Sequence, residues 1–326
     1  MRIAVIGGSG HIGTFLIPRL VRAGHEVINV SRSGGTGYSD SSEWVQVRQV
    51  IADRQKLDGE GEFGDFILAL EPEVVIDLVC FTVESATALV EALRGQVAHL
   101  IHCGSIWRYG PSLKLPILED APEMAGLPFD EYGIQKRAIA QMLKEETAAG
   151  GLVTTSLHPG HIVGPGWHPT GPLGNINPDV WRALSCGEAI RVPGSGTEML
   201  HHVHADDLAQ AFALAVQNRE AAAGEDFNIV APTALSVRGY VEIASAWFGQ
   251  QSAIESIGWD EYRASVNEEY ASQSWGHLHR SHVFSIDKAK HLLDYAPCYE
   301  PEEAILEAVR WLIEHDRLPV AGPLVM

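Results

Sequence analysis

Short apolar runs rich in β-branched residues alternate with longer segments of helical period in the first half of the chain. The runs have the length of strands and are bounded by glycine or polar residues, a pattern typical of buried strands. The predicted strands are Arg2–Ile6, Glu26–Val30, Val45–Ile51, Val74–Val79, His99–His102 and Val153–Leu157. Helices are expected between them, including Ile12–Ala23, Ser85–Leu93 and Tyr132–Ala149. Strands alternating with such helices form right-handed crossovers, so the sequence predicts an α/β fold with a doubly wound, Rossmann-type parallel sheet.

The pattern changes after Gly164, where the stretch PGWHPTGPLGNINP predicts a loop and ends the regular alternation. A mixed set of elements is expected beyond it: Asp206–Val216, Val237–Phe248 and Pro301–His315 as helices and Phe227–Val230 as a buried strand. We therefore divide the chain into a Rossmann domain over residues 1–165 and a smaller, mixed C-terminal region over residues 166–326. Segments of this region, at about 203–232, are expected to return to the Rossmann domain.

The first predicted strand runs directly into Gly7-Gly8-Ser9-Gly10-His11-Ile12-Gly13, after which a helical segment begins. In such a strand–loop–helix unit the first glycine permits a tight turn, the second lets the backbone approach a pyrophosphate, and the third lets helix pack on strand. The position of the motif between a strand and a helix favours a dinucleotide-binding loop over an ordinary turn.

Ser31-Arg32-Ser33 follows the second predicted strand, where an acidic residue would hold the ribose 2′-hydroxyl of NAD. Arg32 can instead pair with a 2′-phosphate, so the sequence favours NADP over NAD, the alternative being a solvated surface arginine. Asp53 closes the third predicted strand and is placed to accept a hydrogen bond from the adenine amino group. Its alternative role is that of a helix N-cap.

Three side chains form the candidate catalytic centre. Tyr132 and Lys136 are four residues apart at the start of a predicted helix, which places them on one helix face. The lysine charge is expected to stabilise the phenolate, so that the phenol exchanges a proton well below its free pKa of about 10. Ser105 follows the fifth predicted strand at the carboxyl end of the sheet, where ligands bind in such folds, and provides a second donor to the reacting oxygen.

Composition limits the partners of the chain. Its 326 residues carry a net charge of −19, which opposes binding to nucleic acid and to anionic membranes. No window contains the ~18 uninterrupted apolar residues of a membrane span, and the N-terminus lacks the pattern of a signal peptide. A cytoplasmic protein is therefore expected. The four cysteines have no CxxC spacing and are interpreted as free thiols.

Together these motifs resemble the extended short-chain dehydrogenases, the NAD(P)-dependent epimerase/dehydratase superfamily. GGSGHIG is similar to the family's glycine motif, GSIWRYG to its strand-five motif, and YGIQK to its YxxxK. LHPGHIVGPG is similar to the segment that wraps the nicotinamide, and HHVHADDLAQAFALAV, FNIV and the C-terminal DKAKHLLDYAPCYEPEEAILEAVRWL match the second half in order and spacing. The resemblance implies that Tyr132 is the acid/base, Lys136 holds the ribose, Ser105 contacts the substrate oxygen, and the second region builds the substrate pocket.

The residues that we expect to bind the cofactor are drawn from the motifs described above. It comprises Gly7, Gly10, His11, Ile12, Gly13, Ser31, Arg32, Asp53, Cys80, Lys136, Pro159 and His161. The resemblance also implies a homodimer formed through the helices Ser85–Leu93 and Tyr132–Ala149.

Two departures from the family pattern narrow the expected reaction. Sugar dehydratases of the family carry an Asp-Glu pair where this chain has Ile106 and Trp107, which argues against dehydration. Leu200 stands where nucleotide-sugar members tend to place a diphosphate-binding arginine, which opposes a nucleotide-linked substrate. The main hypothesis is an oxidoreductase that transfers hydride between nicotinamide and a sugar-like or other small hydroxy or carbonyl compound.

Two other functions stay open. The first is a sugar epimerase with retained NAD, and the second is a non-catalytic dinucleotide sensor or an RNA-binding relative, which the charge of −19 opposes. The histidine groups His201, His202, His204 and His277, His279, His282 are interpreted as pocket or packing residues rather than a metal site. Trp107, Trp167 and Trp181 are either sugar-stacking or core residues.

Overall fold

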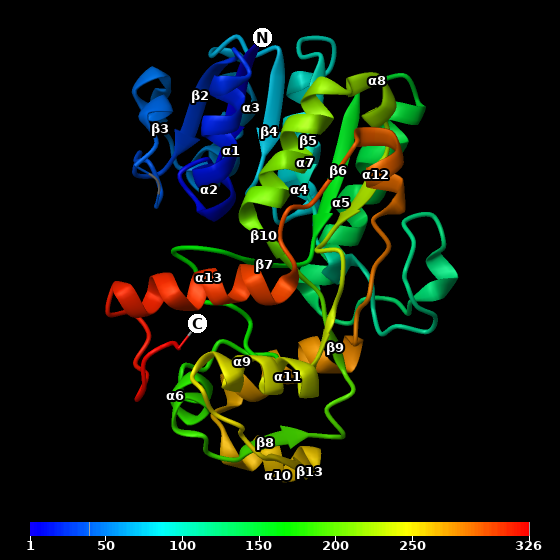
Figure 1. The fold of residues 1–326 in the computed structure, drawn as a ribbon. Coiled ribbons are helices and arrows are strands. Elements are labelled where there is room, and N and C mark those ends of the chain that lie inside the picture. The colour runs from blue at the N-terminus through cyan, green and yellow to red at the C-terminus, as the bar shows by residue number, and fades with distance from the viewer. Residues whose placement is uncertain (39, 326) are drawn as a thin grey trace.

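A seven-stranded sheet is the centre of the upper part of the computed structural model, which describes residues 1–38 and 40–325 (Figure 1). The strand order is β11-β6-β5-β4-β1-β2-β3, and all neighbouring strands are parallel. The strands are β1 (Arg2–Ile6), β2 (Glu26–Ser31), β3 (Arg48–Ile51), β4 (Val74–Asp77), β5 (His99–Cys103), β6 (Thr154–Pro159) and β11 (Asp226–Ile229). The predicted doubly wound α/β fold is therefore confirmed.

Alternate side chains of β1 enter two different hydrophobic layers, as the period of a strand requires. Ile3 and Val5 pack in the layer that contains α1 and α7, whereas Ala4 and Ile6 pack in the opposite layer with α3, α4 and α5. Both faces of the sheet are thus covered, which explains why its strands are continuously apolar. The helices of these layers are α1 (His11–Arg22), α3 (Phe63–Leu68), α4 (Val83–Leu93), α5 (Glu131–Ala148) and α7 (Ala205–Gln217).

The third strand is shorter than the sequence predicts. A 3₁₀ turn, η1 (Ser42–Gln46), occupies the start of the predicted strand Val45–Ile51, and β3 begins only at Arg48. Trp44 is the buried anchor of this turn, while Val45 is 88% exposed. The prediction was wrong here because an apolar run indicates burial but does not show which of its side chains is buried.

The second region has its own hydrophobic core and lies below the sheet in Figure 1. Its helices are α6 (Asp179–Cys186), α9 (Val237–Trp247), α10 (Trp259–Ser265), α11 (Glu268–Arg280) and α13 (Pro301–Glu314). Three two-stranded sheets connect them, formed by β7 (His161–Val163) with β10 (His202–His204), β9 (Met199–Leu200) with β12 (Leu235–Ser236), and β8 (Ile190–Pro193) with β13 (Ile254–Ile257). The remaining helices are α2 (Arg54–Glu60), α8 (Arg219–Ala222) and α12 (Asp287–Leu293), with the 3₁₀ turns η2 (Ile106–Arg108) and η3 (Pro122–Met124).

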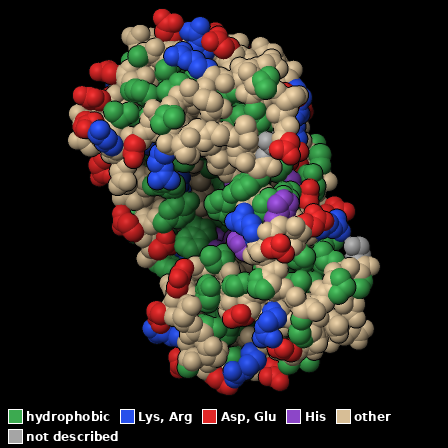
Figure 2. All heavy atoms as spheres, turned by 90° about the vertical axis from the view of Figure 1, so that its left-hand side faces the viewer, with side chains coloured by type: hydrophobic (Ala, Val, Ile, Leu, Met, Phe, Trp, Pro, Cys, Tyr) green, Lys and Arg blue, Asp and Glu red, His purple; other side chains and the backbone are tan. Residues whose placement is uncertain are grey.

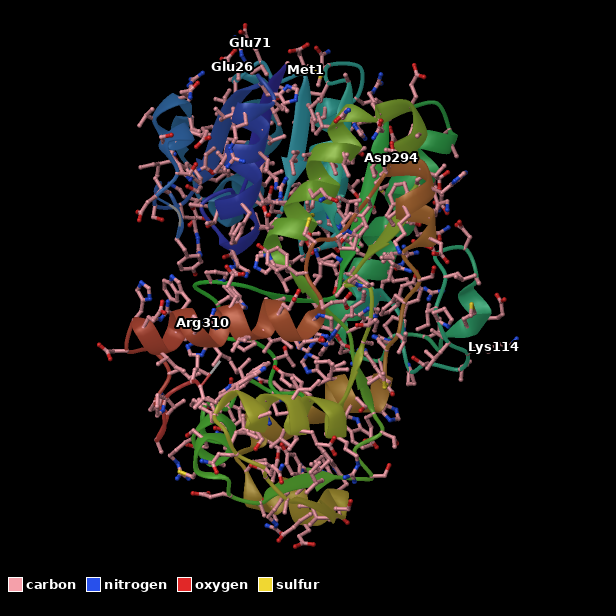
Figure 3. The ribbon with its side chains drawn as sticks, in the orientation of Figure 1. Met1, Glu26, Glu71, Lys114, Asp294 and Arg310 are labelled. Carbon is pink, nitrogen blue, oxygen red and sulfur yellow. The ribbon has the colours of Figure 1, made fainter. Side chains whose placement is uncertain are left out.

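The carboxyl ends of the parallel strands face the second region. The opposite edge of the sheet is marked by Met1, Glu26 and Glu71, which lie at the end of the molecule opposite the second region (Figure 3). The strand order reverses between β1 and β4, which is where open α/β sheets form their ligand crevice. No helix of the described residues is long and apolar enough to cross a membrane.

Candidate active site

A cavity of about 960 Å³ opens at the carboxyl ends of the first strands. Five of the predicted cofactor residues line it, namely Gly7, Gly10, Ser31, Arg32 and Asp53. The other predicted residues lie elsewhere around the crevice: His11, Ile12 and Gly13 in the first turn of α1, Cys80 just after β4, Lys136 in α5, Pro159 at the end of β6 and His161 at the start of β7. The space-filling view of Figure 2 shows a hollow between the two parts of the molecule, with hydrophobic, basic and histidine side chains along it.

The glycine loop has the close packing that its sequence predicts. Gly7 has a φ of +85°, and a methyl group there would lie 2.6 Å from the Val79 side chain. A methyl group on Gly13 would overlap the carbonyl group of Gly8, so α1 can approach the loop only without a side chain. A methyl group on Gly10 would meet only the Gly7 carbonyl oxygen, at 3.2 Å, and Gly10 lines the cavity. These positions fit a dinucleotide whose pyrophosphate rests against the loop.

The three residues predicted to contact the ribose and the adenine differ in how their side chains are held. Arg32 is exposed at the cavity wall, whereas the Ser31 hydroxyl accepts a hydrogen bond from the Gly34 amide at 3.2 Å. The Asp53 carboxylate accepts one from the Lys56 amide at 3.2 Å and is the N-cap of α2. Asp53 therefore has the capping role that the sequence left open, and it also lines the cavity.

Ser105, Tyr132 and Lys136 meet at the carboxyl ends of β4 and β5. The Lys136 ammonium is buried and donates to the carbonyl oxygens of Cys80 and Cys103, both at 2.7 Å. Its nitrogen lies 5.8 Å from the centre of the Tyr132 ring. The Tyr132 side chain hydrogen-bonds with the buried Ser105 side chain. Tyr132 and Lys136, which are four residues apart in the sequence, thus lie together with Ser105 in the folded protein.

The pKa of Tyr132 departs from the sequence-based expectation. Burial raises it to about 12, and the hydrogen bond with Ser105 lowers it by less. Burial also lowers the pKa of Lys136. The expected lowering of the phenol pKa by Lys136 was therefore wrong for the protein alone, because desolvation of the phenolate outweighs the other contributions. The phenol is held in its protonated form at neutral pH.

A buried arginine fixes the start of the helix that carries Tyr132, and nothing in the sequence singled it out. Arg280, at the end of α11, forms an ion pair with Asp130 and stacks between the rings of Trp107 and Phe129, at 4.0 and 4.1 Å. Asp130 is in turn the N-cap of α5 and accepts from the Gly133 amide at 2.8 Å. The second region is thereby tied to the start of α5.

The three candidate tryptophans have different surroundings. Trp107 packs edge-on against Tyr132 and against His277, at ring distances of 6.1 and 5.0 Å. Trp167 is 48% exposed and stacks on His11 at 5.1 Å. Trp181 is buried in the core of the second region, so a sugar-stacking role for it is ruled out.

Most of the histidines are buried and uncharged. Burial lowers the pKa of each member of one set to about 3 or 4: His11, His99, His158, His201, His202, His277 and His282. Many of their ring nitrogens contact backbone carbonyls, for example His202 with Thr170 at 3.0 Å and His282 with Gly110 at 2.9 Å. Among the described residues, no group of three or more His, Cys, Asp or Glu side chains is arranged to hold a metal ion.

Comparisons with known proteins show the family of the chain. The NAD dependent epimerase/dehydratase family matches residues 3–230. A UDP-glucose 4-epimerase of Streptomyces lividans is 28% identical over 329 residues, covering 87% of this chain and 97% of that protein. A 2′-dehydrokanamycin reductase of Streptomyces kanamyceticus is 28% identical over 222 residues, covering 68% and 59%. A chloroplast stem-loop binding protein of Arabidopsis thaliana is 29% identical over 321 residues, covering 94% and 78%.

Solved structures show the same fold. The Thermotoga maritima UDP-glucose 4-epimerase with UDP-glucose has a TM-score of 0.70 and 20% identity, with 97% of this chain and 99% of that chain covered. MoeE5 in complex with UDP-glucuronic acid and NAD gives the same TM-score and identity, with 97% and 100% covered.

Proposed function

The chain belongs to the NAD dependent epimerase/dehydratase family, and on this basis we propose that it is a sugar epimerase in which Tyr132 exchanges the proton of a substrate hydroxyl. The observation that carries the proposal is the meeting of Ser105, Tyr132 and Lys136 beside the glycine-loop cavity. A bound nicotinamide dinucleotide would supply the carbon that accepts a hydride and returns it. The full-length similarity to a UDP-glucose 4-epimerase supports return of the hydride to the opposite face of the sugar.

Each catalytic side chain has a distinct task in this proposal. The Ser105 hydroxyl donates to the reacting oxygen and orients it toward the phenol. Tyr132 takes the hydroxyl proton when the sugar is oxidised and gives it back when the ketone is reduced. Because the pKa of Tyr132 is raised to about 12, the phenol is protonated at neutral pH and its phenolate is a stronger base than that of a free tyrosine. The Lys136 ammonium supplies the nearby positive charge that a phenolate needs.

The substrate we propose is a sugar or sugar acid without a nucleotide diphosphate. Leu200, at the position where an arginine was expected, is fully buried and pairs with Leu235 between β9 and β12. Arg280 already donates to the Gly276 carbonyl at 2.7 Å and to Asp130. A diphosphate therefore meets no arginine at position 200, and the Arg280 guanidinium is engaged by Gly276 and Asp130.

For the cofactor we propose NADP, although a structural neighbour binds NAD. Arg32 is exposed at the wall of the cavity, and Ser31 and Ser33 beside it carry no charge. A 2′-phosphate is attracted to such a guanidinium, whereas a 2′-hydroxyl gains nothing from it.

A net reductase is the second candidate. It is favoured by Arg32, because NADP serves as an exchangeable reductant, and by the similarity to a 2′-dehydrokanamycin reductase. A binding protein without catalysis is the third, given the similarity to a chloroplast stem-loop binding protein. The charge of −19 opposes RNA binding, and an RNA gel shift at low salt tests it.

One experiment separates these functions. The protein is incubated with NAD or NADP and a panel of free sugars, sugar acids and UDP-sugars, each deuterated at the carbon to be oxidised. An epimerase gives the second epimer with the label retained and no net change in the near-ultraviolet absorbance of reduced nicotinamide. A reductase or dehydrogenase changes that absorbance in proportion to product. Dinucleotide binding without either product would contradict the enzymatic proposals.

A further inference from the structure

The backbone of Ser105 is held by a side chain that the motifs did not reveal. The β5–β6 ladder ends where the Gly104 amide donates to the Leu157 carbonyl at 2.7 Å. Ser105 is the next residue, and its amide donates instead to Nδ1 of His158, at 3.3 Å. A methyl group on Gly104 would overlap the same Nδ1 atom, so the histidine ring lies directly against this turn.

Three groups contact the ring nitrogens of His158. The Ser105 amide can only donate, so its hydrogen bond requires the lone pair at Nδ1 and the proton at Nε2. Nε2 lies 3.0 Å from Oδ1 of Asp226 on β11, its acceptor in this tautomer, and 2.6 Å from Nη1 of Arg108, which also contacts Asp226 at 3.0 Å. Burial and the Arg108 charge lower the pKa of His158 to about 4. Burial acts to raise the pKa of Asp226, but its contacts with His158 and Arg108 hold it below its usual range.

We propose that His158, oriented by Asp226, is a positioning residue that fixes the Ser105 backbone and thereby aims its hydroxyl at Tyr132. His158 and Asp226 are 0% and 3% exposed, so neither can contact the substrate in this arrangement. The sheet ladders do not include the Ser105 amide, and the Ser105 hydroxyl accepts a local hydrogen bond from the Trp107 amide at 3.1 Å. The inference rests on the proposed function, because it assigns Ser105 a place in catalysis.

Two amide substitutions test this role, since each can preserve the hydrogen bond of one ring nitrogen of His158 and remove that of the other. In His158→Asn the amide oxygen can occupy the place of Nδ1, so the Ser105 contact is kept and the Asp226 contact is lost. In His158→Gln the longer amide reaches the place of Nε2, so the Asp226 contact is kept and the Ser105 contact is lost. Positioning predicts that kcat falls about 10- to 100-fold in the glutamine variant, with KM and the dinucleotide Kd unchanged. The asparagine variant retains most of the turnover.

If His158 has only a structural role, His158→Asn should lose more activity than His158→Gln, because the asparagine variant removes a partner from the buried Asp226 carboxylate. Equal losses in both variants, or a greater loss in His158→Asn, would therefore overturn the proposal. A double-mutant cycle sharpens it: adding His158→Gln to Ser105→Ala should cause no further loss, whereas multiplying losses would show that His158 acts apart from Ser105.

The same experiments separate this inference from the proposed function. If Ser105→Ala alone has normal turnover, the assignment of Ser105 is wrong and the positioning role is lost with it. If Ser105→Ala is slow but His158→Gln is normal, only the positioning role is refuted. If the variants do not fold, ¹⁵N NMR of the histidines in the wild-type protein decides: the proposal requires His158 to be neutral and protonated at Nε2 at neutral pH, and an Nδ1-protonated or charged ring would overturn it.

Discussion

Alanine substitutions at Gly10 and Gly13 should have opposite effects, although the two residues belong to one loop. A methyl group on Gly13 would overlap the Gly8 carbonyl group and lie 2.5 Å from the Gly8 Cα, all of it backbone. Backbone cannot give way as a side chain does, so we expect Gly13→Ala to lower the free energy of unfolding by about 3 kcal/mol.

Gly10 differs in both conformation and surroundings. Its φ of −83° suits alanine, and the nearest atom to an added methyl group is the Gly7 carbonyl oxygen at 3.2 Å. The free energy of unfolding should therefore change by less than about 1 kcal/mol. The methyl group would stand at the cavity where the pyrophosphate is expected. Losing a charge-assisted hydrogen bond costs about 1.5–3 kcal/mol, so the dinucleotide Kd should rise about 10- to 100-fold.

Urea unfolding and fluorescence titration with NAD and NADP measure the two effects separately. The matched control is Gly59→Ala, since Gly59 lies in α2 with open space around its Cβ position. A Gly10→Ala protein that binds dinucleotide as the wild type does would refute the placement of the pyrophosphate. A Gly13→Ala protein of unchanged stability would refute the packing argument.

Three further predictions concern charge. Arg32→Ala should raise the Kd for NADP about 10- to 100-fold and leave that for NAD unchanged, and equal changes in both titrations would leave Arg32 no role in selection. Arg280→Ala should lower the free energy of unfolding by about 3 kcal/mol because it leaves Asp130 without its buried partner; a melting temperature equal to that of the wild type would contradict this. The buried histidines have pKa values of about 3 or 4 against 6.5 when unfolded, so the unfolded chain binds more protons between these limits. Stability should be complete above pH 6.5 and fall toward pH 4 by up to about 1.4 kcal/mol per pH unit for each histidine, and pH-independent urea midpoints would refute their neutral state.

The features of the fold and of the site that could be predicted from the sequence are those whose residues lie close together along the chain. The glycine loop lies within seven residues, and Tyr132 and Lys136 share one turn of α5, so local periodicity was enough to place them. The alternation of apolar runs and helices likewise gave the parallel sheet. The error at Val45 shows the limit of this reasoning, because a neighbouring tryptophan took the buried position.

The supporting residues could not be predicted because their partners are distant in sequence. Arg280 and Asp130 are 150 residues apart, and His158 and Asp226 are 68 apart. Only the folded sheet and the second region bring them together. The raised pKa of Tyr132 was missed for the same reason, since desolvation depends on the complete packing around the phenol and not on the spacing to Lys136.

Single-turnover kinetics of Tyr132→Phe show whether Tyr132 exchanges the substrate proton during hydride transfer. This change keeps the ring and removes one oxygen. With a substrate identified for the wild type, we expect the rate of nicotinamide reduction to fall about 100-fold or more, while the dinucleotide Kd is unchanged. A Tyr132→Phe protein that reduces its nicotinamide at nearly the wild-type rate would show that Tyr132 is not the acid/base.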